Sequence, residues 1–154
     1  ISSWPSDLPP IEEALRRSGA EVTMITGPVD TPAESGTIHV YSHGRGYAVR
    51  FPGSMGDGAA VVDTMDHALV ERMLLGQILG WEPGDERITY VGGDYSARWL
   101  CAAVDEGRAA VAVLIAPVTV DDFVAVNVNR GAMPRKSTWF VPKARAGLVL
   151  ADLR

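Results

Sequence analysis

The sequence contains a single cysteine, Cys101, so it cannot form a disulfide within the chain. It also lacks cysteines and histidines at zinc-binding spacing, and it therefore predicts no structural metal site. No apolar run is as long as a membrane span, and no signal peptide precedes the first predicted element. These absences favour a cytoplasmic protein that folds without cross-links and without a membrane.

An excess of positive charge is absent as well. The chain has 14 Lys and Arg residues against 19 Asp and Glu residues, which gives a formal net charge of -5. An acidic chain is poorly suited to the phosphate backbone of nucleic acids, so we expect no nucleic-acid partner. With 154 residues, of which 47% are hydrophobic, the chain has the length of one domain that buries its own core.

Residue patterns in the first half predict a helix followed by antiparallel strands. Pro10 suits the first turn of a helix that ends at Gly19, and glutamates and arginines spaced four apart along it predict ion pairs. Segments 21–26, 37–42 and 46–51 are rich in β-forming residues. The glycine in the short connection between the last two segments predicts a hairpin.

The second half alternates between predicted strands and helices. Asp63 is expected to cap a helix that ends at Gly80, and Asp94 to cap a second helix. Segment 87–91 has the composition of a strand, and segment 109–116 is so uniformly apolar that we expect it to be buried on both faces. Strand, intervening helix and strand together predict a right-handed parallel unit.

The full chain is thus expected to form a single domain of the α/β (α+β) class, with a mixed sheet, helices packed on it and an N-terminal hairpin layer. The glycine-rich segment 52–58 is the expected internal seam. Thr119 and Asp122 have the spacing of a capping box at the start of a further helix. The apolar pattern of that helix predicts that Val120, Phe123 and Val124 face inward.

A segment near the C-terminal end concentrates positive charge. Two prolines, Pro134 and Pro142, frame a stretch that cannot be helical and is expected to form a short strand. Cationic side chains and hydroxyls on a rigid loop suit a phosphate or a carboxylate. The residues predicted to contact such an anion are Arg135, Lys136, Ser137, Thr138 and Lys143. The alternative is a solvated loop whose lysines keep an edge strand from pairing with neighbours, and the residues alone favour that alternative.

Other polar groups have simpler structural interpretations. The run Gly92-Gly93-Asp94 precedes a helix, where anions can bind, but it lacks the glycine spacing of a dinucleotide fingerprint and the ending of a P-loop. A tight turn is therefore the better interpretation. His67 beside Asp66 is expected to be an exposed pair, and Cys101 a small core residue. The sequence identifies no nucleophile and no acid–base pair, so the catalytic residues stay unknown.

From Asp66 to its C-terminal end, the chain resembles a bacterial and archaeal family known as domain of unknown function one thousand and fifteen. The most specific match is the segment Met-Pro-Arg-Lys-Ser-Thr-Trp-Phe-Val-Pro-Lys at 133–143, followed by Gly-Leu at 147–148. Supporting similarities lie in Leu74-Leu75, 88–91, 104–107 and 112–117. Arg135 replaces the usual second proline of the family, and Glu71 stands where many members carry histidine.

This resemblance implies that the chain is the C-terminal half of a longer protein, which fits a sequence beginning at Ile1. The upstream half of the family carries an Asp-Gly-His-His-Arg motif similar to that of ParB-like and free-serine-kinase proteins, and these 154 residues lack it. The implied role is to complete an anion- or nucleotide-binding cleft with that half, with ATP or ADP as cofactor of the full-length protein. The chain itself shows no evident cofactor, and whether the full-length protein is an enzyme stays open.

The alternative is a non-enzymatic structural or protein-interaction module. Its partner would be the remainder of its own polypeptide or a second copy in a homodimer.

Overall fold

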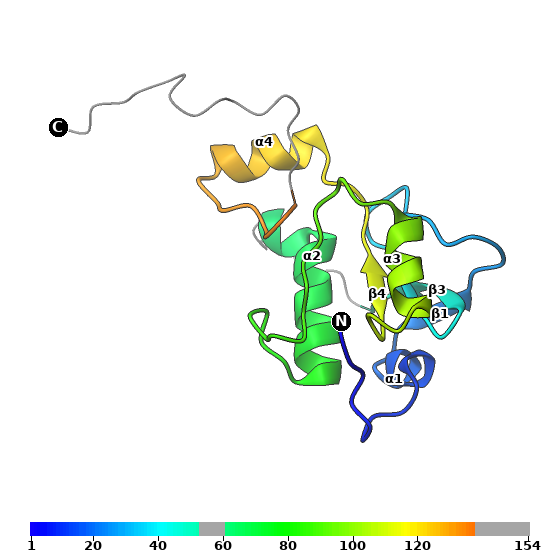
Figure 1. Cartoon of the computed structure of the whole chain (residues 1–154). Coiled ribbons are helices and arrows are strands. Elements are labelled where there is room, and N and C mark those ends of the chain that lie inside the picture. Colours follow the sequence, from blue (N-terminus) through cyan, green and yellow to red (C-terminus); the bar gives the residue numbers. More distant parts are fainter. Residues whose placement is uncertain (53–60, 138–154) are drawn as a thin grey trace.

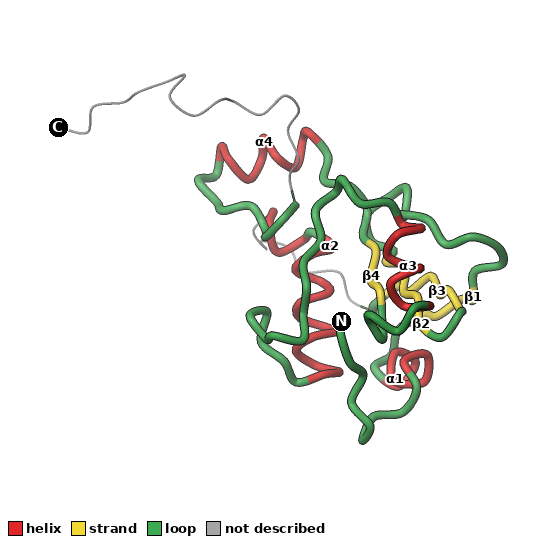
Figure 2. The backbone as a smooth tube through the Cα atoms, in the orientation of Figure 1, coloured by secondary structure: helices red, strands yellow, loops and turns green. Residues whose placement is uncertain are grey.

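The structure is a computed structural model that describes residues 1–52 and 61–137 (Figure 1). In these ranges a small antiparallel sheet is surrounded by helices, as the backbone trace also shows (Figure 2). The elements are α1 (Ile11–Arg17), β1 (Glu21–Met24), β2 (Ile38–Ser42), β3 (Arg45–Arg50), η1 (Val61–Thr64), α2 (Asp66–Leu69), η2 (Val70–Leu79), α3 (Ala97–Asp105), β4 (Ala112–Leu114) and α4 (Val120–Val128). The mixed α and β content confirms the predicted class at this level.

The four strands lie in the order β1-β3-β2-β4, and each neighbouring pair is antiparallel. The predicted hairpin is present as β2 and β3. Its two connecting residues, His43 and Gly44, both have positive φ angles, of 48° and 74°. This is the backbone that a two-residue turn needs to match the twist of its strands, and glycine adopts it without steric cost.

One face of the sheet carries the core. Ile38 and Val40 of β2 form a single buried cluster with Leu15 of α1 and Leu74 of η2, and all four side chains are fully buried. The alternation along β2 explains this, because every second side chain points to the same face. Burying each such side chain stabilises the fold by about 1.5–3 kcal/mol.

The other face of the sheet is covered by α3, which contacts β2 and β4. Tyr41 of β2 donates a hydrogen bond from its hydroxyl to the Asp105 carboxylate at the end of α3, at 2.8 Å. Leu114 of β4 is buried in the same layer. The sheet therefore has helices on both faces, which fixes β4 and α3 as neighbours.

The predicted first helix is confirmed as α1. Glu12 pairs with Arg16 at 3.2 Å, and Glu13 pairs with Arg17, as the four-residue spacing predicted.

The predicted parallel strand–helix–strand unit is wrong. Segment 87–91 forms no strand, and β4 pairs antiparallel with β2. The N-terminal residues account for the difference. The Ile1 carbonyl accepts hydrogen bonds from the amides of Ala110 and Val111, and the Ser2 amide donates to the Arg87 carbonyl. The chain start thus lies between the two segments that were expected to pair, as the N label between the α2–η2 helix and α3 illustrates (Figure 1).

Two predicted helix starts are also wrong. Asp63 lies in the short helix η1, and the long helix begins at Asp66 instead; it does end at Gly80, as predicted. Asp94 lies in a turn, and the cap of α3 is Ser96, whose hydroxyl accepts from the Trp99 amide at 3.2 Å. In both cases an acidic residue with capping chemistry stands a few residues ahead of the true helix start.

The helix α4 has the predicted capping box, in which the Thr119 hydroxyl accepts from the Asp122 amide at 3.1 Å. Its predicted burial is wrong for Val120 and Val124, which are 77% and 50% exposed, while Phe123 is half-buried and Val126 is the buried residue. The expected seam falls outside the described residues from 53 onward. Of the strand expected between Pro134 and Pro142, residues 135–137 lie in a turn instead, and the rest is outside the described residues.

Candidate functional site

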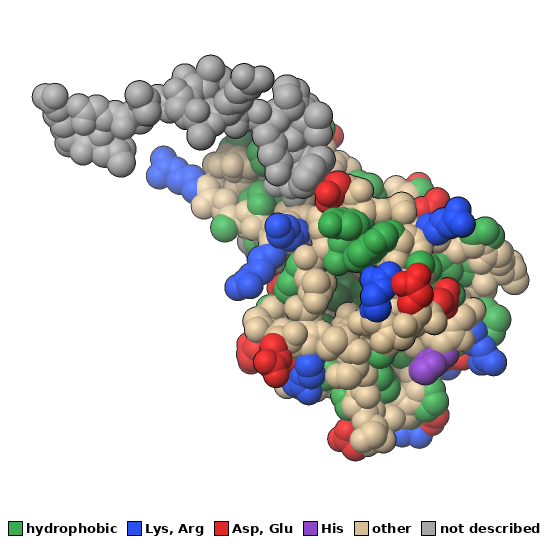
Figure 3. Space-filling view, viewed as in Figure 1, with side chains coloured by type: hydrophobic (Ala, Val, Ile, Leu, Met, Phe, Trp, Pro, Cys, Tyr) green, Lys and Arg blue, Asp and Glu red, His purple; other side chains and the backbone are tan. Residues whose placement is uncertain are grey.

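A cavity of about 290 Å³ lies between the α2–η2 helix, α3, β4 and segment 88–91. Its walls are mostly apolar, and the space-filling view shows a recess with hydrophobic side chains inside it and Lys and Arg side chains around it (Figure 3). Apolar pockets with a few polar groups are the usual form of small-molecule sites. The apolar wall includes Val70, Leu75, Leu100, Val111, Val113 and Ile115.

Two cationic residues predicted from the sequence, Arg135 and Lys136, line this cavity. They occupy the middle of the Pro134–Ser137 turn, in which the Ser137 amide and hydroxyl both donate to the Pro134 carbonyl, at 3.3 and 2.7 Å. Lys136 has a φ of +57°, a conformation that turns usually assign to glycine or asparagine. Lys136 is exposed, and a left-handed backbone at a residue other than glycine is often associated with functional sites.

Neither cation is neutralised by a residue of the described ranges. Among the described residues, no carboxylate lies within 4.0 Å of the Arg135 or Lys136 side-chain nitrogens. Lys136 is also one of only two lysines in the sequence, and the second, Lys143, belongs to the same predicted segment. Positive charge that faces an apolar cavity without a partner is suited to an anionic ligand.

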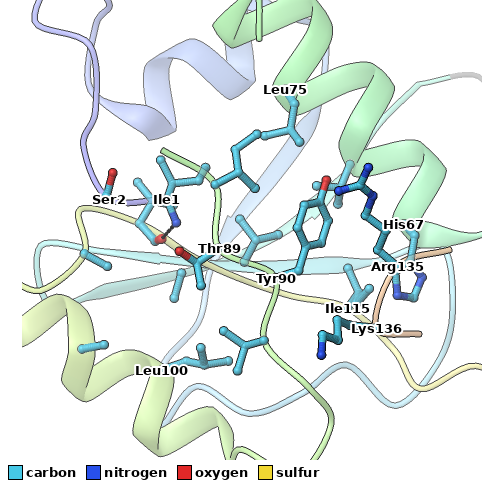
Figure 4. A pocket seen from close by; sticks show the side chains of 18 of the residues that line it. Ile1, Ser2, His67, Leu75, Thr89, Tyr90, Leu100, Ile115, Arg135 and Lys136 are labelled. Atoms are coloured by element: carbon cyan, nitrogen blue, oxygen red, sulfur yellow. Dashed lines mark hydrogen bonds between the residues drawn. The ribbon is translucent and has the colours of Figure 1, made fainter. Parts of the chain in front are cut away.

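A polar cluster from other elements shares this end of the cavity with the two cations. It consists of His67, Glu71 and Tyr90, which come from α2, η2 and segment 88–91. The Tyr90 hydroxyl donates to Glu71 Oε1 at 2.9 Å. Figure 4 shows His67, Arg135 and Lys136 on the same side of the cavity, with Arg135 beside Tyr90.

The surroundings set the charge of two of these groups. Burial raises the pKa of Tyr90 to about 12, and the hydrogen bond to Glu71 acts in the same direction. Burial lowers the pKa of His67 below its ordinary value, although Asp66 and Glu71 oppose the shift. Near neutral pH, Tyr90 is therefore a neutral hydrogen-bond donor and His67 a neutral ring.

At another part of the cavity wall, Trp99 packs against Tyr95. The rings of Tyr95 and Trp99 have centroids 4.5 Å apart, and the Arg108 guanidinium lies 5.3 Å from the centroid of the Trp99 ring. Trp99 and Arg108 both line the cavity, whereas Arg108 also pairs with Glu106 at 2.8 Å. The cation of Arg108 is thus already satisfied, unlike those of the Pro134–Ser137 turn.

The structure brings together only part of the predicted anion site. Ser137 is used in the turn and does not line the cavity, while Thr138 and Lys143 lie outside the described residues. The sequence did not point to Glu71 or Tyr90 as site residues. His67 and Glu71 are spaced four apart and therefore lie on the same face of a helix. This spacing was the sequence pattern that could have indicated Glu71 as a site residue.

Two other predictions are settled by burial. Asp66 is only 4% exposed, so the predicted exposed pair with His67 is wrong. Its Oδ1 accepts from the Ser35 hydroxyl and the Gly36 amide, at 2.9 and 2.8 Å, which ties the loop before β2 to the start of α2. Cys101 is partly exposed rather than fully buried, and burial together with Asp105 raises its pKa, which makes it a poor nucleophile.

Metal binding and membrane insertion find no support in the described parts of the chain. In residues 1–52 and 61–137, no three His, Cys, Asp or Glu side chains are grouped so that they could hold a metal ion. Within the same ranges, none of the helices has the length and apolar character needed to span a bilayer.

Comparison with known proteins returned no match, whether with family models, with curated proteins or with solved structures.

Proposed function

We propose that this chain is a ligand-binding domain that holds the anionic group of a small molecule at the Pro134–Ser137 turn and the apolar body of that molecule in the adjoining cavity. In a longer protein it would complete an anion- or nucleotide-binding cleft with the upstream half. The observation that carries the proposal is that Arg135 and Lys136 line a mostly apolar cavity and have no ion-pair partner among the described residues.

The size of the cavity favours a small ligand. Its volume of about 290 Å³ stands at the lower end of the range of roughly 300–1,000 Å³ for small-molecule pockets. A nucleotide such as ATP or ADP would need further space from the upstream half. In that case the turn would contact only the phosphates, and Thr138 and Lys143 would be expected to add to the contact.

The proposal is tested by titrating the protein with three anions, inorganic phosphate, hexanoate and ADP, while following the amides of residues 135–137 by NMR. Hexanoate combines a carboxylate with an apolar chain and is expected to bind more tightly than phosphate. Lys136→Ala and Arg135→Ala should each raise its Kd by about 10- to 150-fold, because a hydrogen bond to a charged group contributes about 1.5–3 kcal/mol.

Arg16→Ala is the matched control, since it removes the same charge from the exposed surface of α1. It should leave the Kd within about twofold. Absence of any response at 135–137 to all three anions would contradict the proposal, as would equal effects of Arg16→Ala and Lys136→Ala. A response to ADP that is stronger than the response to hexanoate would favour the nucleotide form of the proposal.

A second candidate function is protein interaction through α4. Val120, Val124 and Val128 are spaced four apart on one face of this helix and are 77%, 50% and 75% exposed. If this face joins two copies of the chain, the mass in solution should rise with concentration, and Val124→Asp should abolish that rise. A monomer at all concentrations would exclude the homodimer.

A further inference from the structure

The polar end of the cavity contains a carboxylate that is not needed to neutralise the cations. Glu71 accepts one hydrogen bond at Oε1, from the Tyr90 hydroxyl at 2.9 Å. No cationic nitrogen of the described residues lies within 4.0 Å of its carboxylate. Arg135 is nevertheless near enough to the Tyr90 hydroxyl to oppose the rise of its pKa. The negative and positive groups therefore share one end of the cavity without touching.

The neighbours hold this separation in place. Tyr90 donates to Glu71 and so orients its carboxylate, while the hydrogen bonds of Ser137 to Pro134 fix the turn that carries the cations. His67 lies in the same cluster, and burial keeps its ring from adding a third positive charge. Opposite charges that face a common apolar space without pairing can each be satisfied by a ligand that brings both signs of charge.

We infer that the ligand is a zwitterionic α-amino acid with an apolar side chain. This inference depends on the proposed function, because the ligand carboxylate takes the place of the anion at Arg135 and Lys136. The ligand ammonium would donate to Glu71, and the side chain would lie against Val70, Leu75 and Ile115. Tyr90 is then a positioning residue, since it acts on the ligand through Glu71.

Ligands with one charge fit the cluster less well. An apolar carboxylate would satisfy Arg135 and Lys136 but would place its negative charge near Glu71. An apolar amine would satisfy Glu71 but would add a third positive charge beside the two cations. A cavity of about 290 Å³ is also suited to a molecule of amino-acid size.

The test compares four ligands by isothermal titration calorimetry with the wild-type protein. L-leucine carries both charges, 4-methylpentanoate lacks the ammonium, 3-methylbutylamine lacks the carboxylate, and glycine lacks the side chain. L-leucine is expected to bind most tightly, and each of the other three at least tenfold more weakly. Because these measurements use the unaltered chain, they do not depend on whether a variant folds.

The variant Glu71→Gln tests whether the Glu71 carboxylate binds the ligand ammonium. It should weaken L-leucine binding at least tenfold and remove the preference for L-leucine over 4-methylpentanoate, while the thermal midpoint of unfolding stays close to that of the wild type. Tyr90→Phe should have a smaller effect in the same direction. Glu12→Gln on α1 is the matched control and should change neither affinity.

The outcomes separate this inference from the proposed function. If 4-methylpentanoate binds as tightly as L-leucine and Lys136→Ala weakens it, the anion site stands and the zwitterion is excluded. If Glu71→Gln strengthens L-leucine binding, the role of Glu71 is wrong. If none of the four ligands binds, the inference is overturned. If phosphate, hexanoate and ADP also give no response, the proposed function is overturned as well.

Discussion

Arg87 and Arg135 both lie beside an aromatic side chain, but their charges have different surroundings. The Arg87 guanidinium lies 3.8 Å from the centroid of the Trp81 ring and donates to both Asp85 oxygens, at 2.8 and 2.6 Å. Arg135 lies beside Tyr90 and makes no ion pair with any described residue. We call the first group, Trp81, Asp85 and Arg87, the Arg87 corner.

The two arginines show that the neighbours of a cation indicate whether it contributes to stability or to binding. In the Arg87 corner the carboxylate of Asp85 stands two residues before the arginine. The pair therefore forms within one short loop, and it stabilises the conformation of that loop. Arg135 is brought near Tyr90 only through the packing of distant segments, and it lines a cavity. We therefore expect the corner to govern stability and the Pro134–Ser137 turn to govern binding.

The largest expected effect separates the two groups by stability. Trp81→Ala should lower the free energy of unfolding by about 3–5 kcal/mol, because the ring is only 8% exposed and belongs to the core cluster. Arg135→Ala should change it by less than about 0.5 kcal/mol. Urea denaturation of both variants measures the difference, and similar losses would show that the turn is structural after all.

The second prediction concerns the proton of Tyr90. Burial and Glu71 raise its pKa from 10.0 to about 12. Between these two pH values the folded state keeps the hydroxyl proton, whereas the unfolded chain loses it. A raised pKa means that this contribution to stability is complete below pH 10 and is lost as the pH rises through about 12.

Tyrosine ionisation is followed by absorbance as the pH is raised, in the wild type and in Tyr90→Phe. The difference between the two titration curves gives the titration midpoint of Tyr90. Glu71→Gln should move the midpoint downward. A difference midpoint near 10.0 in the wild type would show that Tyr90 is open to water and is not a fixed part of the cavity.

A smaller effect is expected at Lys136. Lys136→Gly should raise the free energy of unfolding by about 0.5–1 kcal/mol, because glycine adopts the φ of +57° without strain. The same change should weaken anion binding as Lys136→Ala does. Thermal unfolding and hexanoate titration of both variants provide the measurement, and a glycine variant no more stable than the alanine variant would argue against strain at this residue.

The smallest expected effect lies in the Arg87 corner at acid pH. The hydrogen bonds from Arg87 lower the pKa of Asp85 from 3.8 to about 2. A lowered pKa means that the stabilisation is present above pH 3.8 and is lost as the pH falls through about 2. In Asp85→Asn the thermal midpoint should therefore fall less steeply across this range, and identical pH profiles would mean that the pair contributes nothing measurable.

Short sequence patterns predicted correctly those features that are formed by residues close together in the chain. The ion pairs of α1, the turn at His43 and Gly44, and the capping box at Thr119 all depend on residues within four positions of one another. Segment 87–91 was predicted wrongly for the opposite reason. Its composition is that of a strand, but its neighbour is Ser2 from the chain start, a partner that no local pattern indicates.

The candidate site shows the same division. Arg135 and Lys136 could be named from the local density of positive charge, and the structure places both at the cavity. Glu71 and Tyr90 could not, because a hydrogen bond between residues nineteen positions apart is created by packing of a helix against an irregular segment. The apolar wall of the cavity could not be predicted from the sequence either, because its side chains have the same pattern as those of an ordinary core.

The order of the strands has a consequence for how the chain folds. β1, β2 and β3 are consecutive and lie within residues 21–50, so their pairing closes only short loops. β4 must return to β2 from residues 112–114, although β2 ends at Ser42. Because distant contacts cost more loop entropy and form more slowly, we expect the three strands β1-β3-β2 to assemble early and the docking of β4 to limit the folding rate.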